Sequence, residues 1–303
     1  LLIMKPPSIV IDHFLSTKWS KKLFTINHYE LQNGKCIVTQ ELSAYIPDWI
    51  PRGKWRGVSY GHILTDMRNN FIDGCYPVKC CIKGNLSEGE IKYHQGASHL
   101  NSSQVMCINF FKKFFEKEEY EGYLLAVLQC CGISIEGYKI ENAVFEYELD
   151  HEEGTNFDFY LILDDGKRIS FECKYTETEF GGISSDKSKY NRKWDYIYKN
   201  LIANSTFLFT DKKEFYRHYQ INRNIVYADS RDYVLFLTPR ANDAKGICDG
   251  RAYIDNMENQ HIRNIYWEDI IQITLLTVAE CEPLKDYYFK FKSKYLDSWN
   301  EEH

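Results

Sequence analysis

Apolar and polar residues follow a recognisable period only after about residue 100, and the first elements that they predict are helices. Between residues 103 and 117, apolar side chains recur every three to four positions, which is the spacing of an amphipathic helix. The residues at 101–103 are Asn, Ser and Ser, which are good N-cap residues. A second, more buried helix is expected at residues 121–131, where Gly132 ends it.

Three strands are expected next. Residues 139–149 alternate apolar and polar side chains, which is the period of a half-buried strand. Residues 156–163 and 169–175 have the composition of two further strands. The sequence Asp164-Asp165-Gly166 between them is typical of a hairpin turn, so the two strands are expected to pair antiparallel.

The segment after the hairpin predicts further helices and one further strand. Residues 186–201 place apolar side chains on one helix face and basic side chains on the other. Residues 211–224 are also expected to be helical, and residues 233–237 form a short apolar run that predicts a buried strand. Two more helices are expected near residues 255–263 and 283–299.

The order of these elements predicts the fold class. Helix, three strands, helix and strand in succession indicate a mixed α/β fold with a central mixed sheet flanked by helices. Residues 1–95 mix short apolar runs with turns, and we expect an N-terminal region of mixed structure that is a candidate for DNA contact. The core is expected at 96–245 and a helical C-terminal extension at 246–303.

Net charge limits how the protein can hold a polyanion. The 303-residue chain has a formal net charge of -6 and a pI of about 5.9, which argues against a whole-surface grip on nucleic acid. Local basic clusters remain candidates, each against the plainer alternative of a solvated face. They are Lys18, Lys21 and Lys22; Arg52, Lys54 and Arg56 around Trp55; Lys187, Lys189, Arg192 and Lys193; and Lys290, Lys292 and Lys294.

Cysteine usage and hydropathy suggest where the protein works. The 10 cysteines are irregularly spaced, which makes a poor disulfide framework and indicates a reducing cytoplasm. No run of about 18 apolar residues is present, so no membrane span is expected. A zinc site can be imagined from a few neighbouring residues, although their spacing matches no common zinc pattern. These residues are Cys75, Cys80, Cys81, His94 and His99.

The hairpin turn decides which charged side chains meet. Because successive side chains of a strand point to opposite faces, Glu172 and Lys174 share one face. A three-residue loop that ends with Gly166 at positive φ sets Asp158 directly opposite Glu172, with Cβ atoms roughly 4.5 to 5.5 Å apart. A two-residue turn would instead pair Asp158 with Cys173 and direct Glu172 away.

Opposed carboxylates create a candidate site for a divalent cation. Asp158 and Glu172 repel each other at short range, and a cation between them relieves that repulsion. Oxygen ligands favour Mg²⁺, with Mn²⁺ as a substitute, and the carbonyl of Cys173 offers another oxygen. Lys174 is placed to orient an attacking water and to stabilise charge on a phosphate. The alternative is an exposed, salt-bridged hairpin face worth at most about 1 kcal/mol, and spacing alone does not separate the two.

These residues carry a resemblance to a known family. Asp158 followed by Glu172-Cys173-Lys174 on the next strand, in this order of elements, resembles the PD-(D/E)XK nuclease superfamily. Phe157 stands where a proline usually precedes the aspartate. Over residues 95–245, several short stretches resemble a branch of bacterial restriction endonucleases. They are Ser102-Ser103-Gln104, Asn109-Phe110-Phe111, Asn156-Phe157-Asp158 and Glu172-Cys173-Lys174-Tyr175-Thr176-Glu177.

The resemblance implies a fold and a set of roles. The fold is a restriction-endonuclease-like αβββαβ core over residues 96–245. Asp158 and Glu172 hold the metal and Lys174 is catalytic. Auxiliary residues are expected from the first helix, the first strand or a later helix, each against the alternative of an ordinary capping or surface residue. The auxiliary candidates are Gln104, Glu146 and Gln220.

The expected function is a Mg²⁺-dependent endodeoxyribonuclease that hydrolyses phosphodiester bonds of DNA, as a type II-like restriction endonuclease or a defence nuclease of the bacterial cytoplasm. Expected partners are DNA, a second copy of the chain in a homodimer, and a cognate methyltransferase, with no membrane involved. Two alternatives stay open. One is a non-catalytic DNA-binding or regulatory protein with a nuclease-like fold, and the other is an enzyme with different metal chemistry at the cysteines of residues 75–81.

Overall fold

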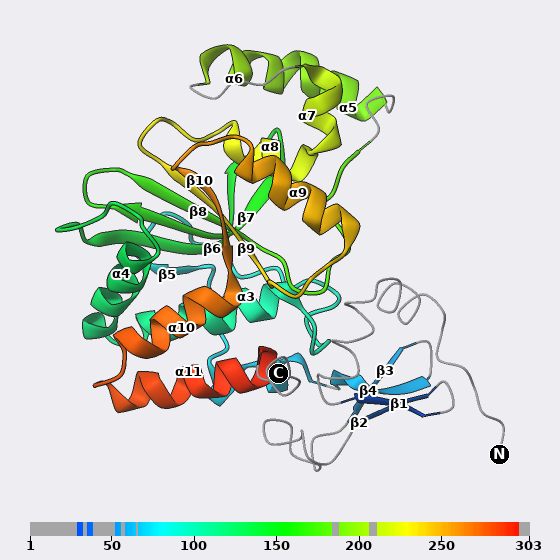
Figure 1. Cartoon of the computed structure of the whole chain (residues 1–303), viewed down its shortest axis with the longest axis vertical. Helices are drawn as coiled ribbons and strands as arrows, with labels where there is room; N and C mark the ends of the chain where they lie inside the picture. Colours follow the sequence, from blue (N-terminus) through cyan, green and yellow to red (C-terminus); the bar gives the residue numbers. More distant parts are fainter. Residues whose placement is uncertain are drawn as a thin grey trace.

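Six strands form one mixed sheet at the centre of the molecule (Figure 1). The computed structural model describes residues 29–32, 35–38, 52–55, 58–64, 66–183, 188–205 and 211–296. The sheet has the order β10-β9-β8-β7-β6-β5. The antiparallel strands are β5 (Cys81–Lys83), β6 (Ile140–Asp150), β7 (Thr155–Leu163) and β8 (Arg168–Cys173), and β9 (Tyr233–Thr238) and β10 (Ile262–Tyr266) continue the sheet in parallel.

Two small sheets precede the large one. They are β1 (Tyr29–Gln32) with β2 (Lys35–Val38), and β3 (Arg52–Trp55) with β4 (Val58–Leu64). Both pairs are antiparallel. Together with β5, these are the strands that the structure describes before residue 96.

One face of the large sheet is covered by four helices that come from both ends of the described chain (Figure 1). They are α3 (Ser103–Phe111), α4 (Glu121–Cys130), α10 (Trp267–Thr277) and α11 (Glu282–Tyr295), with short 3₁₀ turns at Met67–Asn70, Ile72–Gly74, Lys112–Phe115 and Glu118–Tyr120. Phe111 of α3 stacks on Phe159 at 4.2 Å and lies 4.7 Å from Phe171, measured between ring centroids. This aromatic contact fixes α3 directly beneath β7 and β8.

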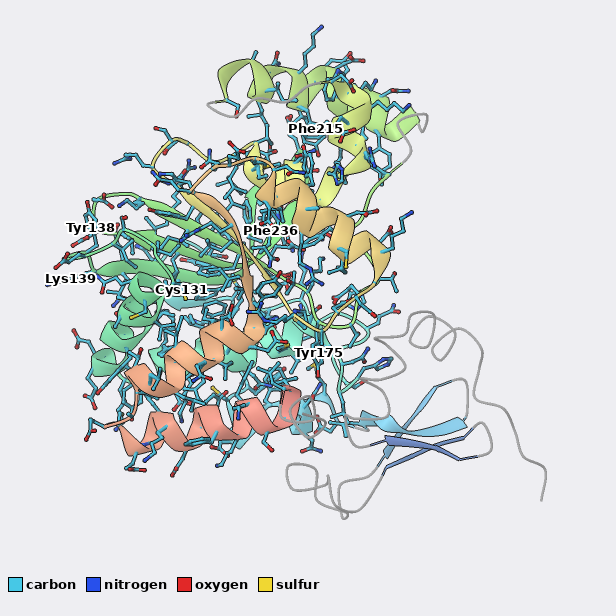
Figure 2. All side chains as sticks on the ribbon, viewed as in Figure 1. Cys131, Tyr138, Lys139, Tyr175, Phe215 and Phe236 are labelled. Atoms are coloured by element: carbon cyan, nitrogen blue, oxygen red, sulfur yellow. The ribbon has the colours of Figure 1, made fainter. Side chains whose placement is uncertain are left out.

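The opposite face of the sheet is covered by α8 (Tyr219–Ile225) and α9 (Lys245–Asp255). Val234 and Phe236 of β9 pack there against Ile221 and Ile247. Side chains fill the space between the sheet and both helix layers, and Phe236 lies between β9 and α9 (Figure 2). The sheet is therefore buried on both faces around β9, which explains why the apolar run at residues 233–237 reads as a buried strand.

A helical lobe lies beyond α8 and α9, at the top of Figure 1. It consists of α5 (Ser188–Lys193), a π-helical turn (Trp194–Tyr198), α6 (Lys199–Asn204) and α7 (Lys212–Arg217). Its own core packs Tyr190, Trp194, Ile197 and Leu201 against aromatic side chains that include Phe215. The amphipathic helix expected here is confirmed, although its expected start at residue 186 lies outside the described residues.

The predicted order of helix, three strands, helix and strand is confirmed, and so is the flanked mixed sheet. The helix expected at residues 255–263 is wrong, because α9 ends at Asp255 and β10 begins at Ile262. Gly246 and Gly250 lie within α9 and weaken its helical pattern in the sequence, since glycine is a poor helix former. Gly250 is nevertheless required, because a Cβ there would meet the ring of Phe180 at 2.2 Å.

Two other helices differ from expectation in their bounds. The segment 211–224 is broken at His218, whose φ of -112° and ψ of 43° separate α7 from α8. The segment 103–117 is α-helical only as far as Phe111 and continues as a 3₁₀ turn. Among the described residues, none of the helices is long and apolar enough to cross a bilayer.

The sheet takes strands from all three expected parts of the chain. β5 comes from the segment before residue 96, and β10 comes from the segment after residue 245. The division at 1–95, 96–245 and 246–303 stays a prediction about folding units. What the topology adds is that the outer strands of one sheet lie on either side of those boundaries.

Candidate active site

The hairpin between β7 and β8 has the turn that sets Asp158 opposite Glu172. Gly166 has a φ of 80° and donates its N–H to the carbonyl of Leu163 at 2.9 Å, while Leu163 donates to the carbonyl of Lys167. The ladder then pairs Ile162 with Arg168 and continues to Phe159 with Phe171. One step further in the same register, Asp158 lies opposite Glu172. The three-residue loop is confirmed, and the two-residue alternative is wrong.

Asp158 lies near the start of β7 and is half-buried. Its Oδ2 accepts the backbone N–H of Cys173 at 2.6 Å, which ties it to the end of β8. Burial raises the pKa of Asp158 well above its usual value, and the negative charges of Glu172 and Glu146 raise it further. This carboxyl group is therefore destabilised in its charged form unless a positive charge reaches it.

Glu172 is buried near the end of β8, where three side chains donate to it. Its Oε1 accepts from Lys174 Nζ at 2.9 Å and from Gln220 Nε2 at 2.6 Å, and its Oε2 accepts from Asn224 Nδ2 at 2.9 Å. Burial alone would raise the pKa of Glu172. The positive charges of Lys174 and Arg223, with the hydrogen bonds, outweigh burial and lower that pKa.

Lys174 follows β8 directly and is also buried. Its backbone is held on both sides, because its N–H donates to the carbonyl of Leu237 at 2.8 Å and its carbonyl accepts from Trp267 Nε1 at 3.0 Å. Burial by itself would lower the pKa of Lys174. The carboxylates of Glu172, Glu177 and Asp158 more than offset burial, so its pKa is raised and the side chain stays an ammonium ion.

β7 has β8 on one side and β6 on the other, and Glu146 is the residue of β6 that stands opposite Asp158. It lies between the ladder pairs Phe145–Phe159 and Tyr147–Phe157. Its backbone φ of 51° is rare in a strand for any residue other than glycine. Gln104 Nε2 donates to its Oε1 at 2.7 Å, and Asn156 Nδ2 donates to its Oε2 at 3.4 Å. Burial raises the pKa of Glu146 despite these two hydrogen bonds.

All seven residues singled out by sequence meet at one open cavity of about 650 Å³. They are Gln104, Glu146, Asp158, Glu172, Cys173, Lys174 and Gln220. Lys92, His94 and His99 line the same cavity, together with residues 101–103 at the start of α3. The helices α3 and α8 and the strands β6, β7 and β8 each contribute to the lining of this cavity.

Sequence reasoning gave no role in the site to Asn156, Glu177 or Asn224. Asn156 and Glu177 also line the cavity. Asn224 does not line it but donates a hydrogen bond to Glu172 from α8. The spacing of Gln220 and Asn224 was the available signal, since positions four apart share a helix face. It carried no weight because the helix is short and nothing in the sequence says which strand it covers.

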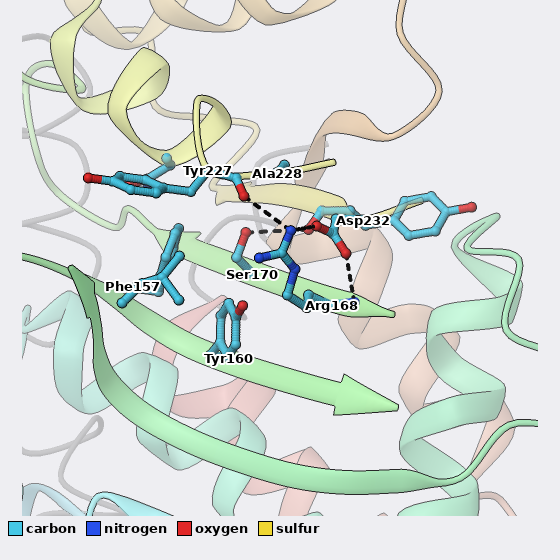
Figure 3. A pocket seen from close by; sticks show the side chains of 10 residues that line it. Phe157, Tyr160, Arg168, Ser170, Tyr227, Ala228 and Asp232 are labelled. Carbon is cyan, nitrogen blue, oxygen red and sulfur yellow. Dashed lines mark hydrogen bonds and ion pairs between the residues drawn. The ribbon is translucent and has the colours of Figure 1, made fainter. Parts of the chain in front are cut away.

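A second, much smaller cavity of about 10 Å³ lies between the sheet and α8 (Figure 3). Arg168 donates to the carbonyl of Tyr227 at 3.2 Å and pairs with Asp232 at its edge. Strand alternation would set Phe157 on the face of Phe159. Phe157 instead lines this cavity, with its ring centroid 5.4 Å from that of Tyr160. The change of face occurs where β6 departs from regular geometry at Glu146 and shifts register between Glu148 and Asp150.

The cysteines do not form the zinc site that their clustering suggested. The described residues contain no group of three His, Cys, Asp or Glu side chains placed to hold one metal ion. Cys75 Sγ faces Glu116, Cys80 Sγ faces Ser87 and the carbonyl of Gly89, and Cys81 Sγ faces the carbonyl of Lys83. The nine cysteines from Cys75 to Cys281 are free thiols.

The basic clusters differ in what they contact. Lys290 pairs with Asp73 at 2.7 Å and Lys294 donates to Asn70 Oδ1 at 2.8 Å, so two lysines of the last cluster join α11 to the segment at residues 70–73. Arg192 is exposed on α5, whereas Lys193 pairs with buried Glu153. The side chains of the clusters at residues 18–22 and 52–56, and of Lys187 and Lys189, lie outside the described residues.

Comparisons with known proteins bear on this site. A family model with the description restriction endonuclease associating with ARP (REase-ARP) matches residues 66–296. The matched segment contains the whole six-stranded sheet and every residue of the cavity described above. No curated protein and no solved structure matched the chain.

Proposed function

Because the chain belongs to the family of restriction endonucleases associating with ARP, we propose that it is a Mg²⁺-dependent nuclease that hydrolyses phosphodiester bonds of DNA. One observation carries the proposal. Asp158 and Glu172 stand one step beyond the last ladder pair of β7 and β8, Lys174 pairs with Glu172, and all three line one open cavity. A family of this name and a carboxylate pair with a buried lysine are both accounted for by metal-assisted hydrolysis.

The donor set fits a hard divalent ion. Asp158 and Glu172 offer carboxylate oxygens. The raised pKa of Asp158 reflects first its burial and then the negative charges of Glu172 and Glu146, which a cation would compensate. The N–H of Cys173 donates to Asp158. In an extended strand the carbonyl of a residue points to the same edge as its N–H, so the Cys173 carbonyl would offer a further oxygen on the side of Asp158. Mg²⁺ commonly binds one or two carboxylates and fills its remaining positions with water and phosphate oxygens, and Mn²⁺ is the expected substitute.

The residues of the chain divide the remaining work. A bound ion would polarise the phosphate and lower the pKa of a water molecule. The Lys174 ammonium, held against Glu172, would orient that water and stabilise charge on a phosphate oxygen. Gln104 and Asn156 hold Glu146, which keeps a third carboxylate on the cavity wall beside Asp158.

The first test removes the central residues one at a time. Asp158→Ala and Lys174→Ala should each abolish cleavage of plasmid, linear and single-stranded DNA in Mg²⁺ and Mn²⁺. Loss of a metal ligand removes several kcal/mol of transition-state stabilisation, which corresponds to a loss of about 1,000-fold or more in rate. Circular dichroism checks that each variant is folded. Retained cleavage by either folded variant would reject the assignment. DNA binding without any cleavage by the wild-type protein would indicate the non-catalytic alternative.

The exposed face of the helical lobe supports DNA as the substrate. Arg192, Tyr196 and Lys199 point outward there, and Tyr196 is 73% exposed with the Arg192 guanidinium 6.0 Å from its ring centroid. Trp194 and Tyr198 stand four positions apart and share the inward face of the helix, which leaves Tyr196 outside. Two cations beside an exposed ring suit a phosphate backbone and a nucleobase face.

Charge reversal tests this surface. Arg192→Glu and Lys199→Glu should each weaken DNA binding about 10-fold at low salt and reduce the slope of log affinity against log salt by about 1. Fluorescence anisotropy with labelled duplex DNA at several salt concentrations measures both quantities. Lys285→Glu on α11 is the control, since it changes net charge equally. Equal weakening by the control would show a general charge effect instead of a local contact.

The proposed activity also suggests a biological role and an oligomeric state. We infer a role in bacterial defence, as a type II-like restriction endonuclease of the reducing cytoplasm, where the free thiols would persist. Cutting both strands of a duplex with one site per chain favours a homodimer, and a host that carries such an enzyme needs protection by a methyltransferase. Analytical ultracentrifugation with and without duplex DNA tests the dimer.

A further inference from the structure

One face of α8 is directed at Glu172. Gln220, Arg223 and Asn224 stand three and four positions apart and therefore share a face of this short helix. Gln220 donates to one carboxylate oxygen of Glu172 at 2.6 Å, and Asn224 donates to the other at 2.9 Å. Burial works against ionisation of Glu172, and the charge of Arg223 assists Lys174 in lowering its pKa. Three side chains of one helix thus act on one carboxylate.

The Asn224 amide has only one workable orientation. A carboxylate only accepts hydrogen bonds, so Nδ2 must face Glu172 and Oδ1 must face away from it. Asn224 is 1% exposed, and its Oδ1 has no hydrogen-bond partner within the described part of the chain. A buried amide oxygen without a partner is unfavourable. Stability alone therefore does not account for an asparagine here, whereas the hydrogen bond to Glu172 does.

The two oxygens of Glu172 face different surroundings. Lys174 and Gln220, which contact Oε1, both line the 650 Å³ cavity. Asn224, which contacts Oε2, lines only the small cavity beside Arg168. Fixing Oε2 on the side of the small cavity therefore leaves Oε1 on the side of the open site, where an ion would take the position that Lys174 Nζ occupies.

We propose that Asn224 and Gln220 are positioning residues that hold the Glu172 carboxylate with Oε1 toward the site where a divalent ion binds. The inference rests on the proposed function, because Glu172 is a ligand of the proposed Mg²⁺ site. Groups that orient a metal ligand change metal affinity or activity by about 10-fold to 100-fold when they are replaced. They leave DNA binding unchanged, since neither side chain touches the surface of the helical lobe.

The test compares two asparagines of the same helix. Asn224→Leu and Asn222→Leu each remove a buried amide from α8, but Asn222 contacts the carbonyl of Phe215 and the hydroxyl of Tyr253 instead of Glu172. Both variants should lower Tm. Only Asn224→Leu should weaken Mn²⁺ binding, measured by titrating the full chain with MnCl₂ in a calorimeter without DNA, by about 10-fold to 100-fold. Its kcat on plasmid DNA should fall while KM stays constant.

A second variant decides the matter if Asn224→Leu does not fold. Gln220→Met keeps a similar volume at a half-buried position and should weaken Mn²⁺ binding about 10-fold. Folded variants that bind Mn²⁺ and cleave as the wild type does would overturn the positioning role. If Asp158→Ala abolishes cleavage while these variants are unaffected, only this inference fails. A wild-type protein that binds no Mn²⁺ and cleaves no DNA would overturn the metal site and this inference together.

Discussion

At the scale of single residues, Gly166 decides which side chain of β7 faces Glu172. Its φ of 80° completes the three-residue loop, and the register of the whole hairpin follows from that loop. A Cβ at this position would meet nothing within 4 Å. The requirement for glycine is therefore one of backbone conformation alone and not of space.

Replacing Gly166 by alanine should isolate that conformational cost. We expect Gly166→Ala to lower the free energy of unfolding by about 1 kcal/mol, because a side chain disfavours positive φ. Cleavage should be retained, since the rest of the ladder still fixes the register. Urea denaturation measures the change. Gly122→Ala is the control, since Gly122 lies in α4 without positive φ or close neighbours, and it should stabilise the protein slightly. Equal effects of the two substitutions would contradict the argument.

Residue-level prediction from the sequence worked where the contact is local. The Asp158–Glu172 pairing was predictable because a single turn of known geometry joins their strands. The contact between Asn224 and Glu172 was not, because it depends on where α8 lies over the sheet. The change of face at Phe157 was also unpredictable, since it follows an irregularity in β6 that no residue type announces.

At the scale of elements, one buried carboxylate joins the helical lobe to the sheet. Glu153 lies in the turn between β6 and β7 and is 2% exposed. Lys193 donates to it at 2.9 Å and Tyr219 at 2.7 Å, and Tyr198 also donates to it. The surface that we propose for DNA contact is therefore attached to the same turn that leads into Asn156 and Asp158.

Removing this carboxylate should loosen the lobe first. Glu153→Ala removes the carboxylate partner of Lys193 and leaves only the hydrogen bond to the backbone carbonyl of residue 153. Breaking a buried ion pair from one side costs about 3–5 kcal/mol. We expect hydrogen exchange to accelerate in residues 188–205 while the strands β7 and β8 stay protected. Exchange mass spectrometry measures both regions. Glu152→Ala, at the exposed neighbouring position, should have no such effect. Uniform acceleration across the chain would contradict a local attachment.

Helices and strands were predictable where the hydrophobic residues recur with a regular period. The strands β6 to β9 and the helices α3 and α4 were found because their patterns are long or sharply bounded. α9 and β10 were missed, since Gly246 and Gly250 weaken the helical signal. Both glycines are required by close contacts, with Glu179 and Phe180 respectively, and such contacts are absent from any local pattern.

At the scale of the whole molecule, α11 joins the two ends of the described core. Lys294 donates to Asn70, and Tyr287 and Tyr288 donate to backbone carbonyls of Asn109 and Phe110 in α3 at 2.6 and 2.8 Å. Burial lowers the pKa of Lys294 to about 7. The folded protein therefore holds the Lys294 proton less tightly than the unfolded chain does.

This difference predicts a pH dependence of stability. The unfolded lysine titrates near pH 10.4, so between about pH 7 and pH 10 the unfolded chain binds more protons than the folded protein. The free energy of unfolding should consequently rise with pH over this window, by at most about 1.4 kcal/mol per pH unit. Urea denaturation at pH 7, 8 and 9 measures the slope relative to Lys294→Met, which cancels the contribution of the buried thiols. Parallel slopes for the two proteins would contradict the prediction.

The packing of α11 on α3 also has a consequence for the order of events during synthesis. A ribosome makes the chain from the N-terminal toward the C-terminal side, so the β7–β8 hairpin with Asp158 and Glu172 emerges well before α11 does. The helix that supplies Gln104 has Phe110 packed against Tyr288 and Phe291, with ring centroids 5.7 and 5.6 Å apart. While the chain is still being translated, α3 lacks that cover. The helix that lines one side of the cavity therefore gains this support only after residue 295 has left the ribosome.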